Sequence, residues 1–171
     1  MNRTFLAAAL AAVALCAHAK TLTVPAFGLS FDAPDGFKPV PADLVAAKWK
    51  EPPAFVVGTE RATTTIAVDL KTTAVRPDQV PEMEKAMEGM MPRLMPGLQW
   101  IRHDMVTLNG RPWAELEMTT VAHDTGIHNI LLATSWQGRM LILNFNSTTG
   151  EFPTYEAALR KSIESVRITG P

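Results

Sequence analysis

Polar and apolar side chains alternate along the second half of the chain, with the period of two that is typical of β-strands. Four such segments form two pairs, one around the turn dipeptide Asn109-Gly110 and the other around Gln137-Gly138. They are residues 98–108, 112–122, 127–136 and 139–146. Because two-residue turns connect antiparallel neighbours, we predict a meander of four strands.

In the last two of these segments, apolar side chains occupy both even and odd positions along the strand, and not only the positions of one face. Alternate residues of a strand point to opposite faces of its sheet. One set is Ile130, Leu132, Leu141, Leu143 and Phe145, and the other is Leu131, Ala133, Met140 and Ile142. A sheet with one face in water keeps that face polar, so we expect both faces of these strands to be covered.

Apolar residues at helical spacing predict two long helices that would supply the covers. The first spans residues 81–97, with Asp78 as N-cap and Pro81 in the first turn. The second spans residues 152–166, and a shorter helix is predicted at residues 42–50. Further strands are predicted at residues 21–24, 28–34, 54–60 and 64–72. These elements indicate an α+β domain, a three-layer α/β/α sandwich with a mostly antiparallel sheet.

Five of the nine methionines fall within residues 81–97. On a helix they form one apolar stripe with Val80 and Leu94, as expected for a helix that packs on a sheet. Thioethers also bind Cu(I), and Met87 and Met91 are one helical turn apart, as two ligands would need to be. We prefer packing to copper binding, because Val80 and Leu94 share the stripe and cannot ligate a metal.

The methionine stripe contains more large side chains than one covering helix needs. Its excess, together with the tryptophan that follows it, could line a groove for an apolar peptide or a lipid. The candidate residues for this groove are Met87, Met91, Met95 and Trp100.

A second metal interpretation concerns His123 and His128, which flank a short loop. If Thr125-Gly126 is the turn of a hairpin, the two imidazoles face each other and, with Asp124, could hold a metal ion weakly. A functional metal site needs three or four ligands and a supporting shell. We therefore expect two exposed hairpin residues and commit to no metal site.

Motifs of catalysis are missing from the sequence. It has no G-x-S-x-G elbow, no H-E-x-x-H helix and no glycine-rich phosphate loop. Glu115 and Glu117 share one face of a predicted strand, and we expect both to point to water. We expect a non-catalytic protein with no cofactor.

The N-terminus has the features of a secretory signal peptide in residues 1–19. A short apolar run follows Arg3 and ends in Ala17-His18-Ala19. We expect cleavage near Ala19 rather than lipidation of Cys16, because Leu15 fits lipoprotein processing poorly. Cleavage would leave residues 20–171 as one cysteine-free domain in the bacterial periplasm. The remaining apolar runs are too short to cross a membrane.

The charge pattern excludes one class of partner. The chain carries a formal charge of −1 and contains no basic tract with interleaved aromatic residues. We therefore expect no nucleic-acid partner. The oligomeric state is left open.

The order of elements resembles the Mog1/PsbP-like group, and within it the bacterial DcrB-type envelope proteins. Four stretches carry the resemblance: residues 28–40, 108–118, 130–145 and 155–168. The resemblance implies an antiparallel sheet between helices and a role in binding or assembling other proteins. It supplies no catalytic residues. We therefore predict a periplasmic protein that binds another envelope protein or peptide, as an assembly factor or an immunity-type inhibitor. A methionine-rich copper-binding protein and a lipid carrier are the alternatives.

Overall fold

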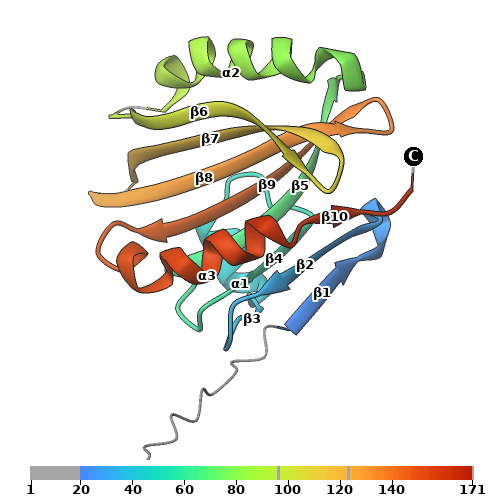
Figure 1. Ribbon diagram of the computed structural model, residues 1–171. Coiled ribbons are helices and arrows are strands. Elements are labelled where there is room, and N and C mark those ends of the chain that lie inside the picture. The colour runs from blue at the N-terminus through green and yellow to red at the C-terminus, as the bar shows by residue number, and fades with distance from the viewer. Residues whose placement is uncertain (1–19, 96, 123, 171) are drawn as a thin grey trace, which may run out of the picture.

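A seven-stranded sheet runs through the middle of the molecule (Figure 1). The computed structural model describes residues 20–95, 97–122 and 124–170, so the predicted signal peptide lies outside the described residues. Every neighbouring pair of strands in this sheet is antiparallel. The strands, in spatial order, are β3 (Lys38–Pro39), β4 (Phe55–Gly58), β5 (Thr64–Ala74), β9 (Arg139–Thr148), β8 (Thr125–Trp136), β7 (Arg111–Ala122) and β6 (Gln99–Leu108). The predicted α+β class with a mostly antiparallel sheet is confirmed.

Two tight turns hold the β6–β9 meander in register. Asn109 and Gly110 both have positive φ, as do Gln137 and Gly138. Positive φ at both central residues is the requirement of the two-residue turn whose twist matches that of the flanking strands. The two turn dipeptides read from the sequence therefore fix these two hairpins.

Helix α2 (Val80–Leu94) covers one face of the sheet and contacts β6, β7 and β8 (Figure 1). Its buried methionines, Met83, Met87 and Met91, pack against Leu116 and Met118 of β7. The helix continues past Pro92, as the single apolar stripe requires. It begins after the short 3-10 turn η2 (Pro77–Gln79), and Gln79 rather than Asp78 is its N-cap.

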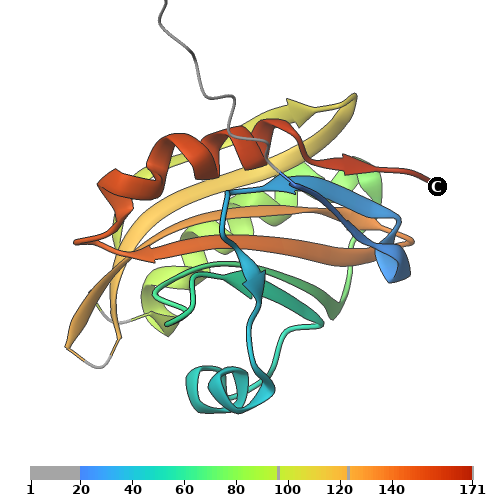
Figure 2. The ribbon, with the colours of Figure 1, turned by 90° about the horizontal axis from the view of Figure 1, so that it is seen from below.

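The opposite face is covered by helix α3 (Phe152–Glu164) together with a second, small sheet (Figure 1, Figure 2). In that sheet β2 (Leu29–Ala33) lies between β1 (Lys20–Val24) and β10 (Arg167–Ile168), and α3 contacts both β2 and β9. The three-layer α/β/α arrangement is therefore not confirmed in its predicted form, because strands share this cover with the helix.

Two short elements complete the described part of the chain. The 3-10 turn η1 (Pro25–Phe27) links β1 to β2, and helix α1 (Ala42–Lys48) follows β3. Among the described residues, no helix is long and apolar enough to cross a membrane.

The parity pattern of the two central strands is confirmed residue by residue. Ile130, Leu132, Leu141, Leu143 and Phe145 belong to the core on the α3 side. Ala133 is buried in the core on the α2 side, and Leu131, Met140 and Ile142 pack against that core. The double parity in β8 and β9 thus reflects two separate cores.

Two expectations about β7 and the loop after it are wrong. The side chains of Glu115 and Glu117 are buried rather than solvent-exposed. Strand β8 begins at Thr125, so Thr125-Gly126 is paired with β7 and is not the turn.

Candidate functional site

Two cavities open on the α2 side of the large sheet, near opposite ends of β9. One, of about 320 Å³, is lined by Met83, Met90 and Met140 among other residues. The other, of about 470 Å³, lies where α1 and the end of α2 meet the sheet, and Trp49 and Met95 are among the residues that line it. Both volumes fall in the range of small-ligand pockets.

A strip of β9 runs from one cavity to the other. Met140 lines the first cavity and Thr148 the second, and they are separated by about 26 Å at the rise of a β-strand. Ile142 and Asn144 lie between them on the same face, and both are half-buried. We call the two cavities and this strip the α2 groove.

The strip of β9 between the cavities contains a polar atom without a partner. The Oδ1 atom of Asn144 is buried and accepts no hydrogen bond from any residue that the structure describes. A buried acceptor left unpaired costs about 1 to 3 kcal/mol. Such atoms are uncommon in folded proteins, and this one lies beside the candidate site.

Two exposed apolar side chains of α2 lie next to the methionines that pack below it. Met90 is 51% exposed and Leu94 is 65% exposed. Because Met90 also lines the first cavity, one flank of α2 presents apolar surface to the α2 groove. Thioethers adapt their shape readily and are frequent at adaptable binding surfaces.

The four predicted groove residues are divided among different surroundings. Met87 lines the first cavity, although it is only 7% exposed, and Met95 lines the second. Met91 is buried in the core under α2. Trp100 lies on β6, where its ring meets that of His103 edge to face at 5.5 Å. Met87 and Met95 therefore line two different cavities, and a groove formed by all four residues stays a prediction.

The cavity at the α1 end combines apolar walls with polar groups. Asn129 donates a hydrogen bond to Thr120 at 3.2 Å, and Thr65 donates one to Asn146 at 2.8 Å. Asn129, Thr120 and Asn146 all line this cavity. Amide and hydroxyl groups can each donate and accept, so the cavity can bind a ligand that carries both kinds of group.

An ionic cluster lies on the opposite face of the sheet, between β7, β8 and α3. Glu117, which is 3% exposed, accepts hydrogen bonds from Arg160 at 2.9 Å and from His128 at 2.8 Å. The imidazole of His128 stacks on Phe152 with the ring centroids 3.4 Å apart. Burial raises the pKa of Glu117, but the hydrogen bonds from Arg160 and His128 outweigh it and leave the pKa below its ordinary value.

One of the two histidines of the second metal interpretation, His128, faces a glutamate. His128 pairs across the sheet with Thr119, and its imidazole is held by Glu117. His123 lies outside the described residues. The half-buried His128 is therefore an interior ionic partner and not an exposed hairpin residue.

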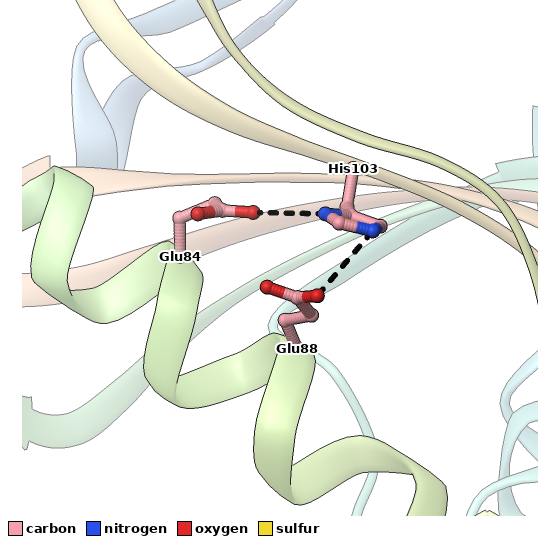
Figure 3. A group of neighbouring side chains, drawn as sticks. All are labelled: Glu84, Glu88 and His103. Carbon is pink, nitrogen blue, oxygen red and sulfur yellow. Dashed lines mark ion pairs between the residues drawn. The ribbon is translucent and has the colours of Figure 1, made fainter.

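A third cluster joins α2 to the edge strand β6 (Figure 3). Glu84 and Glu88, one helical turn apart, both point toward the imidazole of His103. One ligand atom from each of the three residues lies within 4.8 Å of the other two. The sequence interpretation missed this group, although two glutamates four residues apart on a helix were a visible signal.

Comparison with known proteins finds likeness at the level of structure. No protein-family model matches the sequence, and no curated protein matches it. The solution structure of cyanobacterial PsbP from Synechocystis sp. PCC 6803 is similar, with a TM-score of 0.61 at 14% identity over 95% of this chain and 98% of that one. LpqN, involved in cell envelope biogenesis of Mycobacterium tuberculosis, is similar with a TM-score of 0.60 at 17% identity, over 83% of each chain.

A Pseudomonas aeruginosa protein of unknown function is also similar, with a TM-score of 0.50 at 14% identity over 90% of this chain and 99% of that one. Identities this low establish only the fold. The comparisons do not show the DcrB-type family, and that assignment stays a prediction. The chain has the fold of the PsbP-like proteins.

Proposed function

We propose that this chain is an exported, non-catalytic protein of the bacterial envelope. It binds an extended, largely apolar segment of another envelope protein in the α2 groove. The observation that carries the proposal is the pair of cavities, of about 320 and 470 Å³, near the two ends of one strand. Alternate side chains of an extended peptide point the same way. A peptide lying across this strip could therefore place apolar side chains in one cavity and pair its amides with the polar groups of the other.

The length of the groove matches a short peptide. The distance of about 26 Å from Met140 to Thr148 corresponds to roughly eight extended residues. Met83, Met90 and Met140 would receive apolar side chains at one end. The amide and hydroxyl groups of Thr120, Asn129 and Asn146 are suited to peptide groups at the other end.

The lipid alternative receives less support from the same cavities. An acyl chain gains nothing from the polar groups at the α1 end, and their desolvation would oppose its binding. The copper alternative is also weakened, because Met87 and Met91 are each 7% exposed and pack in the core. Neither thioether is presented to solvent as a soft metal ligand.

The non-catalytic part of the proposal is supported by the surroundings of the histidines. In the described part of the chain, the imidazoles of His103 and His128 pair with glutamates. Neither is hydrogen-bonded there to a serine or threonine hydroxyl, the arrangement that a histidine-activated nucleophile would need.

The binding proposal is tested by selecting peptides against the purified protein from a displayed random library. We expect enrichment of sequences about eight residues long with apolar residues at alternate positions. Titration of a selected peptide should show binding that weakens at least about tenfold in Met90→Glu, because a charge would enter the apolar wall. Val121→Glu is the matched control, since Val121 is a similarly exposed apolar residue outside both cavities.

Two outcomes would contradict the binding proposal. One is failure to enrich any peptide family, and the other is equal loss of affinity in Met90→Glu and Val121→Glu. A lipid that co-purifies with the protein, detected by mass spectrometry, would favour the lipid alternative.

Export has a separate test. Mass spectrometry of the protein from the envelope fraction of its source cell should find a chain that begins at Lys20. A chain that begins at a lipid-modified Cys16 would show membrane anchoring instead.

A further inference from the structure

The cluster of Glu84, Glu88 and His103 offers a binding site on the other flank of α2, away from the α2 groove. We propose that Glu84, Glu88 and His103 bind a divalent transition-metal ion of the Zn²⁺ type. The ion would join α2 to the edge strand β6. This inference is independent of peptide binding, because it uses none of the residues that line the two cavities.

The three side chains converge because of local geometry. Glu84 and Glu88 are four residues apart and therefore lie on one side of α2. An irregularity in the β6–β7 register between Trp100 and Arg102 sets which β6 side chains face α2. His103 is one of them, and its ring lies between the two carboxylates (Figure 3).

One atom from each of the three side chains can approach a common ion. His103 Nδ1 lies 3.6 Å from Glu84 Oε1, and His103 Nε2 lies 3.4 Å from Glu88 Oε1. Both distances are longer than a charge-assisted hydrogen bond of about 2.7 to 2.9 Å. One ion binds only one of the two ring nitrogens, and one such nitrogen lies within 4.8 Å of an oxygen of each glutamate. A bound ion would draw these three atoms together, to the separation of about 3.3 Å between two ligands of a tetrahedral Zn²⁺.

The burial of Glu84 is a second, independent indication of a ligand. The residue is 7% exposed, and the contact recorded for its carboxylate among the described residues is the one with His103. A buried carboxylate is costly unless a cation or hydrogen-bond donors compensate its charge. The only positive partner recorded for it in the described part of the chain is His103, at a distance too long for a hydrogen bond. A divalent ion would supply the missing compensation.

The donor set selects the class of ion. Two carboxylate oxygens and one imidazole nitrogen suit Zn²⁺ or Mn²⁺, whereas Cu(I) prefers sulfur. The side chains of Glu88 and His103 are 41% and 36% exposed, so the site is open to solvent on one side. That opening gives the ion a path of entry and leaves room for water as a further ligand.

The fluorescence of Trp100 can report metal binding at this site. Its ring meets the imidazole of His103 edge to face, with the centroids 5.5 Å apart. A metal ion on His103 would change the surroundings of the indole, and a paramagnetic ion would quench its fluorescence. Trp100→Phe should remove that signal without removing a ligand.

The test is calorimetric titration of the purified protein, without a histidine tag, with Zn²⁺ and then with Mn²⁺. We expect binding of one Zn²⁺ per chain at about 10 µM or tighter. At saturation the melting temperature should rise by about 5 °C or more. Glu88→Gln and His103→Gln should each weaken affinity at least about tenfold, and both residues are exposed enough to be replaced without unfolding the protein.

Two matched controls make the result specific. Glu82→Gln removes an exposed glutamate from the same helix, and His128→Gln removes the other described histidine from the opposite face. Both should keep the affinity of the wild type for Zn²⁺. Binding weaker than about 1 mM, or equal loss in the controls, would overturn the assignment of the site.

Discussion

Glu117 on β7 accepts two hydrogen bonds from the guanidinium of Arg160 on α3. Arg160 Nη2 lies 2.9 Å from Glu117 Oε1, and Arg160 Nη1 lies 3.4 Å from Glu117 Oε2. This paired contact ties α3 to a strand on which the helix makes little other contact. The carboxylate is nearly inaccessible to solvent, so its interaction with Arg160 is screened much less than that of a surface ion pair.

Replacement of Glu117 by glutamine should destabilise the fold. The substitution keeps the shape of the side chain but removes its charge, and it leaves Arg160 with a poorer acceptor. We expect a loss of about 1 to 3 kcal/mol in the free energy of unfolding, measured by urea denaturation. Glu156→Gln is the control, because Glu156 also binds Arg160 but is partly exposed. Its effect should stay below about 0.5 kcal/mol.

The same carboxylate should make stability depend on pH in a defined direction. The pKa of Glu117 in the folded protein lies below its ordinary value of 4.5, because the hydrogen bonds from Arg160 and His128 outweigh the effect of burial. The unfolded chain therefore takes up this proton first as the pH falls. The stabilisation is complete above the unfolded pKa and is lost as the pH falls through the folded pKa.

We expect the stability difference between wild type and Glu117→Gln to be constant near neutral pH. The difference should shrink as the pH falls below the ordinary pKa of 4.5, and urea denaturation at each pH measures it. A difference that grew on acidification would show that the folded pKa is raised instead.

Two glycines should respond to alanine in opposite directions. Gly28 has a φ of 55°, and a Cβ atom there would lie 2.2 Å from the backbone oxygen of Thr169. Gly89 is a helical residue of α2 with nothing within 4 Å of the same position. We expect Gly28→Ala to cost about 2 kcal/mol or more and Gly89→Ala to add about 0.5 to 1 kcal/mol. Thermal denaturation monitored by circular dichroism measures both.

The buried methionines of α2 should tolerate exchange for leucine. Met87→Leu/Met91→Leu keeps the apolar volume, so each change should cost less than about 1.5 kcal/mol. Met87→Ala leaves a cavity and should cost about 2 to 5 kcal/mol. Anaerobic Cu(I) titration should give the same weak response for wild type and the double leucine variant. Tight Cu(I) binding that the leucines abolish would restore the copper interpretation.

The regular parts of the fold could be predicted from short-range patterns. The two turn dipeptides of the β6–β9 meander set its hairpins, and the double parity of β8 and β9 marked strands covered on both faces. The methionine stripe located α2 because burial under a helix follows its period. In each of these elements, neighbours in sequence decide the local structure.

The polar clusters could not be predicted in this way. Glu117 looked like a solvent-exposed strand residue because its partner Arg160 is 43 residues further along the chain. His103 could not be assigned to a face of β6, since the register irregularity after Trp100 interrupts the alternation. Trp100 was placed in the predicted groove because it follows the methionine stripe in the sequence. Such contacts depend on how distant elements pack.

Sequence patterns also could not predict that a small sheet shares with α3 the cover of one face of the large sheet. Strands β1 and β2 were predicted, but nothing local to them indicates that they form a separate sheet with β10. That sheet is closed by a short pairing of Arg167 with Ser30 and Ile168 with Leu29. The pairing joins segments that are far apart in the sequence, so a local pattern cannot predict it.

The central claim, that the α2 groove holds a peptide of another envelope protein, is tested most directly by photo-cross-linking in the source cell. A photoreactive amino acid at position 90 should form an adduct with one envelope protein, mapped by mass spectrometry to an extended apolar segment. The same group at position 121, an exposed site outside the cavities, should not form that adduct. No adduct at position 90, or the same adduct from both positions, would contradict the account.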